Sequence, residues 1–199
     1  MSVFLCFFLL YTMNNLLVKI KECKICEDCI DPKPIVFVNK TSRIIIIGQA
    51  PGLKVHQSGI PWDDASGKQL RKWLGVTVDQ FYDTNNFGII PMGFCYPGKG
   101  KSGDLPPRKE CAPQWHNLLL EKMKHVELVI LIGMYAQNYY LKKVVKRTLT
   151  ETVSNYKEYL PTYFVLPHPS PRNRFWLAKN PWFEKEILPK LKMKVREII

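Results

Sequence analysis

Residues 43–52 read Arg-Ile-Ile-Ile-Ile-Gly-Gln-Ala-Pro-Gly. The unbroken run of isoleucines predicts a strand that is buried on both faces, as in a parallel sheet. The Gly and Pro residues that follow favour a tight turn, which can bring the backbone close to a ligand. Segment 43–52 therefore predicts a strand and, at its carboxyl end, a loop where open α/β sheets bind their ligands.

Further apolar runs lie over residues 87–92, 127–132 and 163–166. The segments around these runs have apolar residues at helical spacing, which predicts helices over residues 14–21, 67–74, 112–124, 135–145 and 182–195. Strands that alternate with amphipathic helices are typical of an α/β protein with a parallel sheet. The chain shows no internal repeat and no low-complexity tract.

Two of the later runs also lead into loops rich in Gly and Pro, Gly93-Phe-Cys-Tyr-Pro-Gly98 and Pro167-His-Pro-Ser-Pro-Arg-Asn173. The carboxyl ends of parallel strands share one edge of the sheet. We therefore expect these loops to converge with segment 48–52 and to form the binding site there.

The composition is that of an ordinary globular domain. The 199 residues suit one domain, and a content of 46% hydrophobic and 23% charged residues argues against disorder. Lys and Arg outnumber Asp and Glu by 29 to 17, for a formal net charge of +12. Such an excess favours a polyanionic partner, because neutralised phosphates release their counterions, but it also serves simple solubility. Charge alone leaves both interpretations open.

The N-terminal residues 2–13 form a short apolar run. The run is too short to span a bilayer comfortably and lacks the basic region and the small-residue cleavage site of a secretory signal. We therefore interpret residues 1–13 as an appendage, either a disordered or docked tail or an over-long gene assignment whose true start is Met13. Residues 14–199 are predicted to form the domain of a cytoplasmic protein without a membrane anchor.

Several segments, in a fixed order, resemble the signatures of one family. Gly48-Gln-Ala-Pro-Gly52 is similar to the Gly-Glu-Ala-Pro-Gly motif of the thermophile-type, iron–sulfur uracil-DNA glycosylases, family 4 of that superfamily. Gly59-Ile-Pro-Trp62 stands where that family has Gly-x-Pro-Phe, with Gly67 and Leu70 following at the same distance, and His168-Pro-Ser-Pro171 resembles the second motif of the classical uracil enzymes. The resemblance covers residues 23–173.

This resemblance implies a three-layer α/β/α fold around a central, mainly parallel four-stranded sheet. It also implies a monofunctional DNA glycosylase, which hydrolyses the N-glycosidic bond of uracil or another damaged base and leaves an abasic site. Such an enzyme takes the nucleotide out of the stack and holds its base in a pocket. The implied partner is DNA, and we expect a monomer associated with the nucleoid.

The resemblance assigns roles to the first motif and its neighbours. The loop residues Gly48, Ala50, Pro51 and Gly52 would bind the base, with Gln49 next to the attacking water. Trp62 would stack on the flipped base, although a tryptophan there could also belong to the core.

The second motif is expected to act on the leaving base and on the DNA strand. His168 would donate a hydrogen bond to the departing base as negative charge develops on it, instead of only capping a Pro-rich turn. Ser170 and Pro171 would hold the phosphate backbone, and Arg172 stands where relatives place the residue that probes the duplex. Arg172, with Arg174 and Lys179, could instead bind phosphates.

Cysteines supply a candidate metal site. Cys23 and Cys26 form a C-x-x-C pair, and Cys95 and Cys111 stand far apart from it in the chain. Four thiolates suit either zinc or an iron–sulfur cluster, and the resemblance favours a structural four-iron, four-sulfur cluster with no part in bond breaking. Cys29 could replace one member of the pair but is predicted to be a spare thiol, and Cys6 lies in the appendage.

The chain departs from the family at two positions. Gln49 replaces the family's Glu, and Ala50 stands where the classical enzymes have an Asp. A primary amide cannot act as a general base at neutral pH, so either Gln49 orients water by hydrogen bonds alone or a nearby carboxylate, Asp63 or Asp64, acts in its place. Asp64 is our preferred candidate.

The second departure concerns recognition of the base. Pro91 occupies the place of the Asn that reads the uracil edge, and proline has no donor there. We therefore do not expect strict selectivity for uracil, and Asn85, Asn86 and Met92 are the nearest possible substitutes. These losses also support a second hypothesis, a catalytically inactive iron–sulfur protein of the same fold that binds nucleic acid. A zinc-ribbon-like module fits less well, because the Cys pairs lie far apart in an α/β chain.

Overall fold

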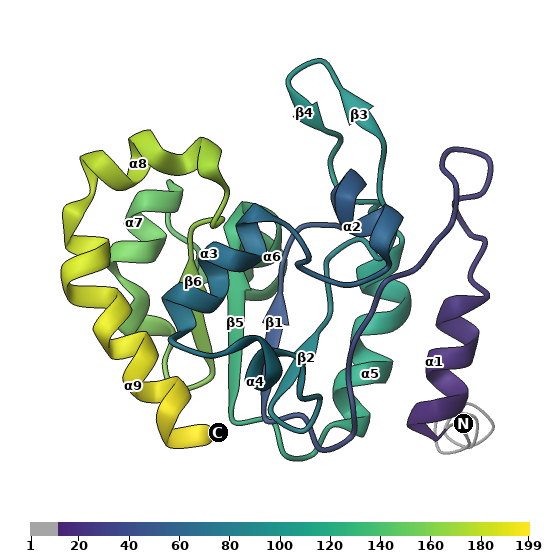
Figure 1. The fold of residues 1–199 in the computed structure, drawn as a ribbon, viewed down its shortest axis with the longest axis horizontal. Coiled ribbons are helices and arrows are strands. Elements are labelled where there is room, and N and C mark those ends of the chain that lie inside the picture. The colour runs from purple at the N-terminus through teal and green to yellow at the C-terminus, as the bar shows by residue number, and fades with distance from the viewer. Residues whose placement is uncertain (1–11) are drawn as a thin grey trace.

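A computed structural model describes residues 12–199 of the protein, and its fold is drawn in Figure 1. The central sheet consists of β1 (Ile44–Ile47), β2 (Phe87–Ile89), β5 (Leu128–Ile132) and β6 (Tyr163–Leu166). Its strand order is β2-β1-β5-β6, and every neighbouring pair is parallel. The predicted four-stranded parallel sheet is confirmed.

Strand β1 occupies the centre because both of its faces are apolar. Ile44 to Ile47 are fully buried, and β1 pairs with β2 on one side and with β5 on the other. The strand predicted over residues 87–92 ends earlier, at Ile89. Pro91 does not interrupt the pairing with β1, because the N–H that it lacks would point away from that strand. The backbone stays next to β1, since Ile90 N–H donates to Ile46 O at 3.0 Å and Met92 N–H to Gly48 O at 2.9 Å.

Helices cover both faces of the sheet. From β1 the chain crosses to one edge of the sheet through α2 (Leu53–Ser58), α3 (Ala65–Leu74) and α4 (Val78–Tyr82). From β2 it returns through α5 (Asn117–Lys122), and α6 (Gly133–Leu141) and α7 (Leu149–Ser154) then lead from β5 to β6. The connection from β1 to β2 runs in one direction across the sheet, and those from β2 to β5 and from β5 to β6 run in the other. Because crossovers between parallel strands are right-handed, connections in opposite directions place their helices on opposite faces of the sheet. The helices α1 (Met13–Lys21) and α9 (Leu188–Ile198) pack against α5 and α3, respectively, which completes the three-layer α/β/α fold.

Several predicted helices begin or end elsewhere. The segment predicted over residues 112–124 starts with a wide turn at Ala112–His116, and the one predicted over residues 182–195 does so at Phe183–Ile187. In the second case Pro189 has no N–H for a bond to the carbonyl four residues earlier, so the regular α-helix begins only at Leu188. The helix predicted over residues 135–145 begins at Gly133, and its α-helical part ends at Leu141, before a short turn at Lys142–Val144.

Two further elements frame the upper part of Figure 1. A hairpin of β3 (Lys99–Gly100) and β4 (Gly103–Asp104) projects from the edge at which the strands end. On the other side of the upper part lies the short helix α8 (Arg174–Lys179), which follows the turn Pro171–Asn173. Most of the predicted appendage, residues 1–11, lies outside the described range. Its last two residues belong to the domain, because Thr12 caps α1 and Met13 is buried in the core. None of the helices in residues 12–199 is long and apolar enough to cross a membrane.

Candidate active site

The loops after β1, β2 and β6 meet at the carboxyl edge of the sheet, as expected, and enclose a cavity of about 650 Å³. Every residue predicted for the site lines this one cavity: Gly48, Gln49, Ala50, Pro51, Gly52, Trp62, Asp64, His168, Ser170, Pro171 and Arg172. Asp63, the other carboxylate considered from the sequence, does not line it. One ligand in the cavity would therefore be within reach of both motifs.

The first motif is tied to the segment after β2. The carbonyl oxygen of Gly48 accepts from Met92 N–H and that of Gln49 from Gly93 N–H, both at 2.9 Å. A Cβ atom on Gly48 would lie only 2.9 Å from Trp62 Cζ2, so glycine lets the indole pack directly on the loop. The side-chain amide of Gln49 has no hydrogen-bond partner among the described residues, which leaves it available to a ligand.

Trp62 is held in an uncommon backbone conformation. Its φ is +59°, in the left-handed region that a bulky side chain rarely adopts. Its carbonyl oxygen accepts from Arg71 Nη1 at 3.3 Å and packs so tightly on Gly67 that a Cβ atom there would lie 1.7 Å away. Tyr82 OH donates to the carbonyl of Pro61 at 2.9 Å. The surrounding structure thus aims the indole into the cavity, which explains the fixed Gly67 spacing.

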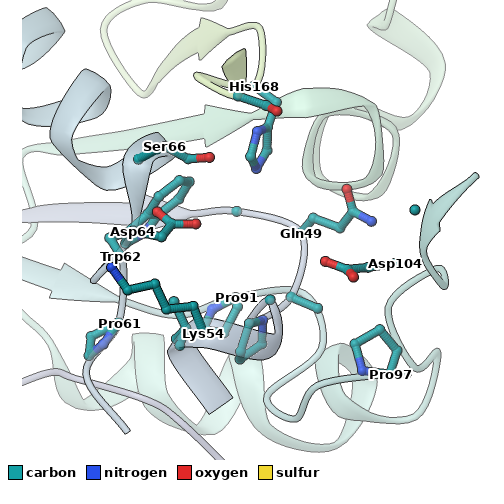
Figure 2. A pocket seen from close by; sticks show the side chains of 18 of the residues that line it. Gln49, Lys54, Pro61, Trp62, Asp64, Ser66, Pro91, Pro97, Asp104 and His168 are labelled. Atoms are coloured by element: carbon teal, nitrogen blue, oxygen red, sulfur yellow. The ribbon is translucent and has the colours of Figure 1, made fainter. Parts of the chain in front are cut away.

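Trp62 and His168 bring the two motifs into contact. Their ring centroids are 5.6 Å apart and the ring planes are inclined by 32°, and Figure 2 shows both rings at the cavity. Asn173 Nδ2 donates to the carbonyl of His168 at 2.7 Å and holds the second loop in place. Gly133 has a φ of +80°, in the left-handed region that favours glycine, and a Cβ atom there would be at ordinary contact distance, 3.9 Å, from His168 Cβ.

The imidazole of His168 is poised in its neutral form. Burial lowers the pKa of His168 below its usual value, and the charge of Asp64 opposes this shift only in part. At neutral pH the ring therefore keeps one N–H and can donate it without first carrying a positive charge. A neutral donor suits a site in which negative charge develops on the ligand.

Asp64 lies at the cavity but has a structural task there. Its Oδ1 accepts from Gly67 N–H at 2.8 Å and caps the N-terminus of α3. Figure 2 shows it beside Trp62, on the side of the cavity away from the tip of Gln49. The carboxylate that sequence reasoning selected thus has one oxygen engaged by the helix.

The residue in place of the family's Asn, Pro91, lines the cavity without offering a donor. Its carbonyl oxygen lies 3.1 Å from Nε2 of the buried His116, whose Nδ1 is 2.6 Å from Tyr140 OH. Burial lowers the pKa of His116 to about 4, so the ring is neutral and donates to Pro91 from Nε2 while accepting from Tyr140. The Pro91 carbonyl therefore already has a hydrogen-bond partner within the protein, and this part of the cavity lining offers no donor to a ligand.

The substitutes considered for that Asn do not enter the cavity. Asn85 Nδ2 donates to Asp83 Oδ1 and Asn86 Nδ2 to Asp83 Oδ2, at 3.0 and 3.1 Å, and neither side chain lines the site. Met92 is buried in the core. Ser66 does line the cavity, and its hydroxyl has no hydrogen-bond partner among the residues described.

Sequence reasoning missed the polar residues contributed by the hairpin and by α2. Asp104, Ser102 and Lys54 line the cavity together with Ser66 and Asn173. Arg172 Nη1 donates to the carbonyl of Ser102 at 3.4 Å, so the second motif touches the hairpin tip. Asn173 was visible in the second motif, but the hairpin residues follow no hydrophobic period, so no local pattern indicated that they return to the cavity.

The four cysteines of the predicted cluster line a second, smaller cavity together with Phe94 and Trp115. Cys26, Cys95 and Cys111 are buried, whereas Cys29 is exposed and lies outside it. Burial raises the pKa of Cys95 to about 12, with further contributions from the neighbouring cysteines. Four gathered thiols fit a group with thiolate ligands, because its positive charge offsets the cost of ionising them. Over residues 12–199, however, no group of three or more His, Cys, Asp and Glu side chains is arranged to hold a single metal ion.

Fold and site together define an α/β protein whose Gly- and Pro-rich loops form one binding cavity at the carboxyl edge of a parallel sheet. A model of the uracil DNA glycosylase superfamily matches residues 35–192. The chain therefore belongs to the uracil DNA glycosylase superfamily, whose proteins bind DNA and generally hydrolyse its N-glycosyl bonds. The matched range begins after Cys23 and Cys26, so it does not bear on the iron–sulfur subtype.

Proposed function

We propose that the protein is a monofunctional DNA glycosylase, which hydrolyses the bond between a damaged base and deoxyribose and leaves an abasic site. The observation that carries this proposal is the contact between Trp62 and His168, which joins a stacking surface and a neutral donor in one cavity. The volume of about 650 Å³ lies within the range of small-ligand sites and leaves room for an extruded nucleotide.

The roles of the cavity residues follow from their positions. The loop Gly48–Gly52 receives the base, and the exposed part of the Trp62 indole stacks on it. His168 donates a hydrogen bond to the base oxygen on which negative charge develops as the bond breaks. Ser170, Pro171 and Arg172 also line the cavity, and Pro171 and Arg172 are exposed, so these residues would contact the strand that carries the flipped nucleotide.

The substrate is uracil or another damaged base. The wall at Pro91 offers no donor, because proline has no N–H and its carbonyl already binds His116. A pocket without a group that reads one edge of the base discriminates weakly against related bases. This favours a broader choice of lesion than in an enzyme with an amide at this position.

We further propose a four-iron, four-sulfur cluster on Cys23, Cys26, Cys95 and Cys111, as in family 4, in preference to zinc. Their common cavity supports this ligand set, and the exposed position of Cys29 supports its exclusion. When bound, the cluster would supply a rigid crosslink. Cys95 and Cys111 flank the β3–β4 hairpin, so their attachment would hold both ends of the segment that carries Asp104.

The test is a glycosylase assay on oligonucleotides that carry uracil, hypoxanthine, xanthine or related lesions, in single and double strands. Cleavage of the strand by alkali after incubation reports abasic sites, and a monofunctional enzyme gives no cleavage without alkali. The competing function, an inactive iron–sulfur protein that binds nucleic acid, is favoured by Gln49, Ala50 and Pro91. It would be supported if cluster-containing protein bound the oligonucleotides and processed none of them.

A further inference from the structure

The first motif has no carboxylate, but the β3–β4 hairpin contributes one to the same cavity, that of Asp104. Gln49 and Ala50 offer no general base, whereas Asp104 at the end of β4 lines the same cavity. Asp104 comes from the segment between Cys95 and Cys111, more than 50 positions from Gln49 by their numbers. It was not among the residues predicted for the site.

The position of Asp104 is set by contacts on both sides of the hairpin. Its Oδ2 lies against the first motif, 3.4 Å from where a Cβ atom on Gly52 would be, and its Oδ1 is 3.4 Å from Tyr96 OH. At the tip, a Cβ atom on Gly103 would come within 2.4 Å of Arg172 Nη1. The base of the hairpin is closed by Leu105 N–H, which donates to Gly98 O at 2.9 Å.

Asp104 also has more freedom to act than Asp64 does. Asp64 uses Oδ1 to cap α3, whereas the carboxylate of Asp104 forms no ion pair with any cation among the described residues and has only the long contact to Tyr96. In Figure 2 Asp104 points into the cavity on the side of Gln49, and Asp64 lies on the side of Trp62. Of the two carboxylates that line the cavity, Asp104 is thus the one on the side of Gln49, the position at which relatives carry their water-activating group.

An acidic side chain at this place is unfavourable for DNA binding. The protein has a formal charge of +12, and the hairpin itself contains Lys99 and Lys101. Asp104 pairs directly across from Lys99 in the β3–β4 ladder, so its negative charge lies next to a positive one within a basic element. Attraction to phosphates therefore does not account for a carboxylate at this place in the cavity.

We propose that Asp104 is the general base of the reaction, with the Gln49 amide as the group that orients the water. This inference rests on the proposed glycosylase function. The bond between C1′ and the base nitrogen breaks, and the base leaves with the bonding electrons while His168 donates a hydrogen bond to it. The water oxygen bonds to C1′ and its proton passes to Asp104. That proton then returns to solvent, and the base anion takes up a proton.

The experiment measures single-turnover cleavage of the preferred lesion with enzyme in excess, together with the affinity of each variant for the same DNA. The variants are Asp104→Asn, Asp64→Asn and Asp79→Asn, the last an exposed carboxylate on α4 outside the cavity. Removal of a general base costs about 10²–10⁴ in rate. Asp104→Asn should lose that much while binding DNA at least as tightly, because a negative charge is gone. Asp79→Asn should match the wild type.

A second measurement separates chemistry from folding. Asp104→Ala should regain part of its rate in formate, a small carboxylate that can occupy the vacated space, whereas Asp104→Asn, which retains the side-chain volume, should not. The inference is overturned if Asp104→Asn cleaves like the wild type, or if Asp64→Asn alone shows the large loss. Those outcomes leave the glycosylase function standing. Failure of the wild type to cleave any lesion would instead remove the glycosylase proposal itself, and this inference with it.

Discussion

The indole of Trp62 and the imidazole of His168 lie 5.6 Å apart, centroid to centroid, with their planes inclined by 32°. Trp62 lies between the internal strand β1 and helix α3, whereas His168 follows β6, an edge strand of the sheet. Their contact joins the two signature motifs across β5. Both loops therefore line one cavity, in which a ligand can contact the indole and the imidazole together.

Replacement of His168 by Ala should reduce the single-turnover rate by about 10²–10³, the usual cost of a lost oxyanion-type donor. Affinity for DNA should change little, because the ring faces the base and not the phosphates. Rapid-quench cleavage and fluorescence anisotropy measure the two quantities. His125→Ala, at an exposed histidine outside the cavity, is the matched control and should behave like the wild type.

The Asp64→Asn variant should lower the pKa of His168 further. Burial lowers this pKa and the Asp64 charge raises it, so removing the charge leaves burial unopposed. Titration of the His168 ring by NMR measures the change directly. An increase in the pKa of His168 would contradict the electrostatic coupling between these two residues.

Trp62→Ala should weaken binding of DNA that carries the target base by roughly 1–3 kcal/mol, the worth of one base–aromatic stack. Binding of undamaged DNA should remain nearly unchanged, since no base is then held in the cavity. Trp62→Phe retains an aromatic face and should recover most of the affinity. Equal losses for damaged and undamaged DNA would show that Trp62 does not contact the flipped base.

Anaerobically purified wild-type protein should be brown and contain iron and acid-labile sulfide in equal amounts. Replacing Cys26 or Cys95 with Ser should remove both, because each side chain lines the thiol cavity. Cys29→Ser is the control and should keep the cluster, since Cys29 is exposed and outside that cavity. Colourless wild-type protein with one zinc ion per chain would decide for zinc.

Lys99→Gln and Lys101→Gln should flatten the dependence of DNA affinity on salt. Each phosphate contact that is lost reduces the slope of log affinity against log salt by roughly 0.9 for duplex DNA. Both lysines lie on the hairpin beside the cavity. Lys190→Gln, at an exposed position on α9, is the control and should leave the slope unchanged. An unaltered slope in the hairpin variants would place the DNA elsewhere.

His116 should make the folded protein less stable in mild acid. Burial lowers the pKa of His116 to about 4 in the folded state, whereas in the unfolded chain it is about 6.5. Between pH 6.5 and pH 4, therefore, only the unfolded chain binds a proton at this residue. Above pH 6.5 His116 therefore does not lower the free energy of unfolding. Below that pH it lowers this free energy progressively, by roughly 3 kcal/mol at most. Urea denaturation at pH 7 and pH 5 measures it. His116→Gln should lose less stability between these values than the wild type does.

Local patterns in the chain were enough for the sheet and for the motif loops. Ile44 to Ile47 can be buried on both faces only in a central strand, and the Gly- and Pro-rich loops after the strands must then share one edge. The motif residues from Gly48 to Arg172 consequently line one cavity, as predicted. Helix ends were less accurate, because Pro189 and the left-handed Gly133 shift them by a few residues.

Two features of the cavity depend on contacts between segments far apart in the chain: the position of Asp104 and the hydrogen bond of the Pro91 carbonyl to His116. Asp104 reaches the cavity because its hairpin packs on Gly52 and Arg172, and the Pro91 carbonyl is satisfied because His116 approaches from the turn before α5. Neither arrangement has a period or a motif, since the residues involved are brought together by loop packing and not by the spacing of apolar side chains. The sequence therefore sufficed for the fold and for the position of the cavity, whereas the further polar groups that line this cavity followed from how the loops pack around it.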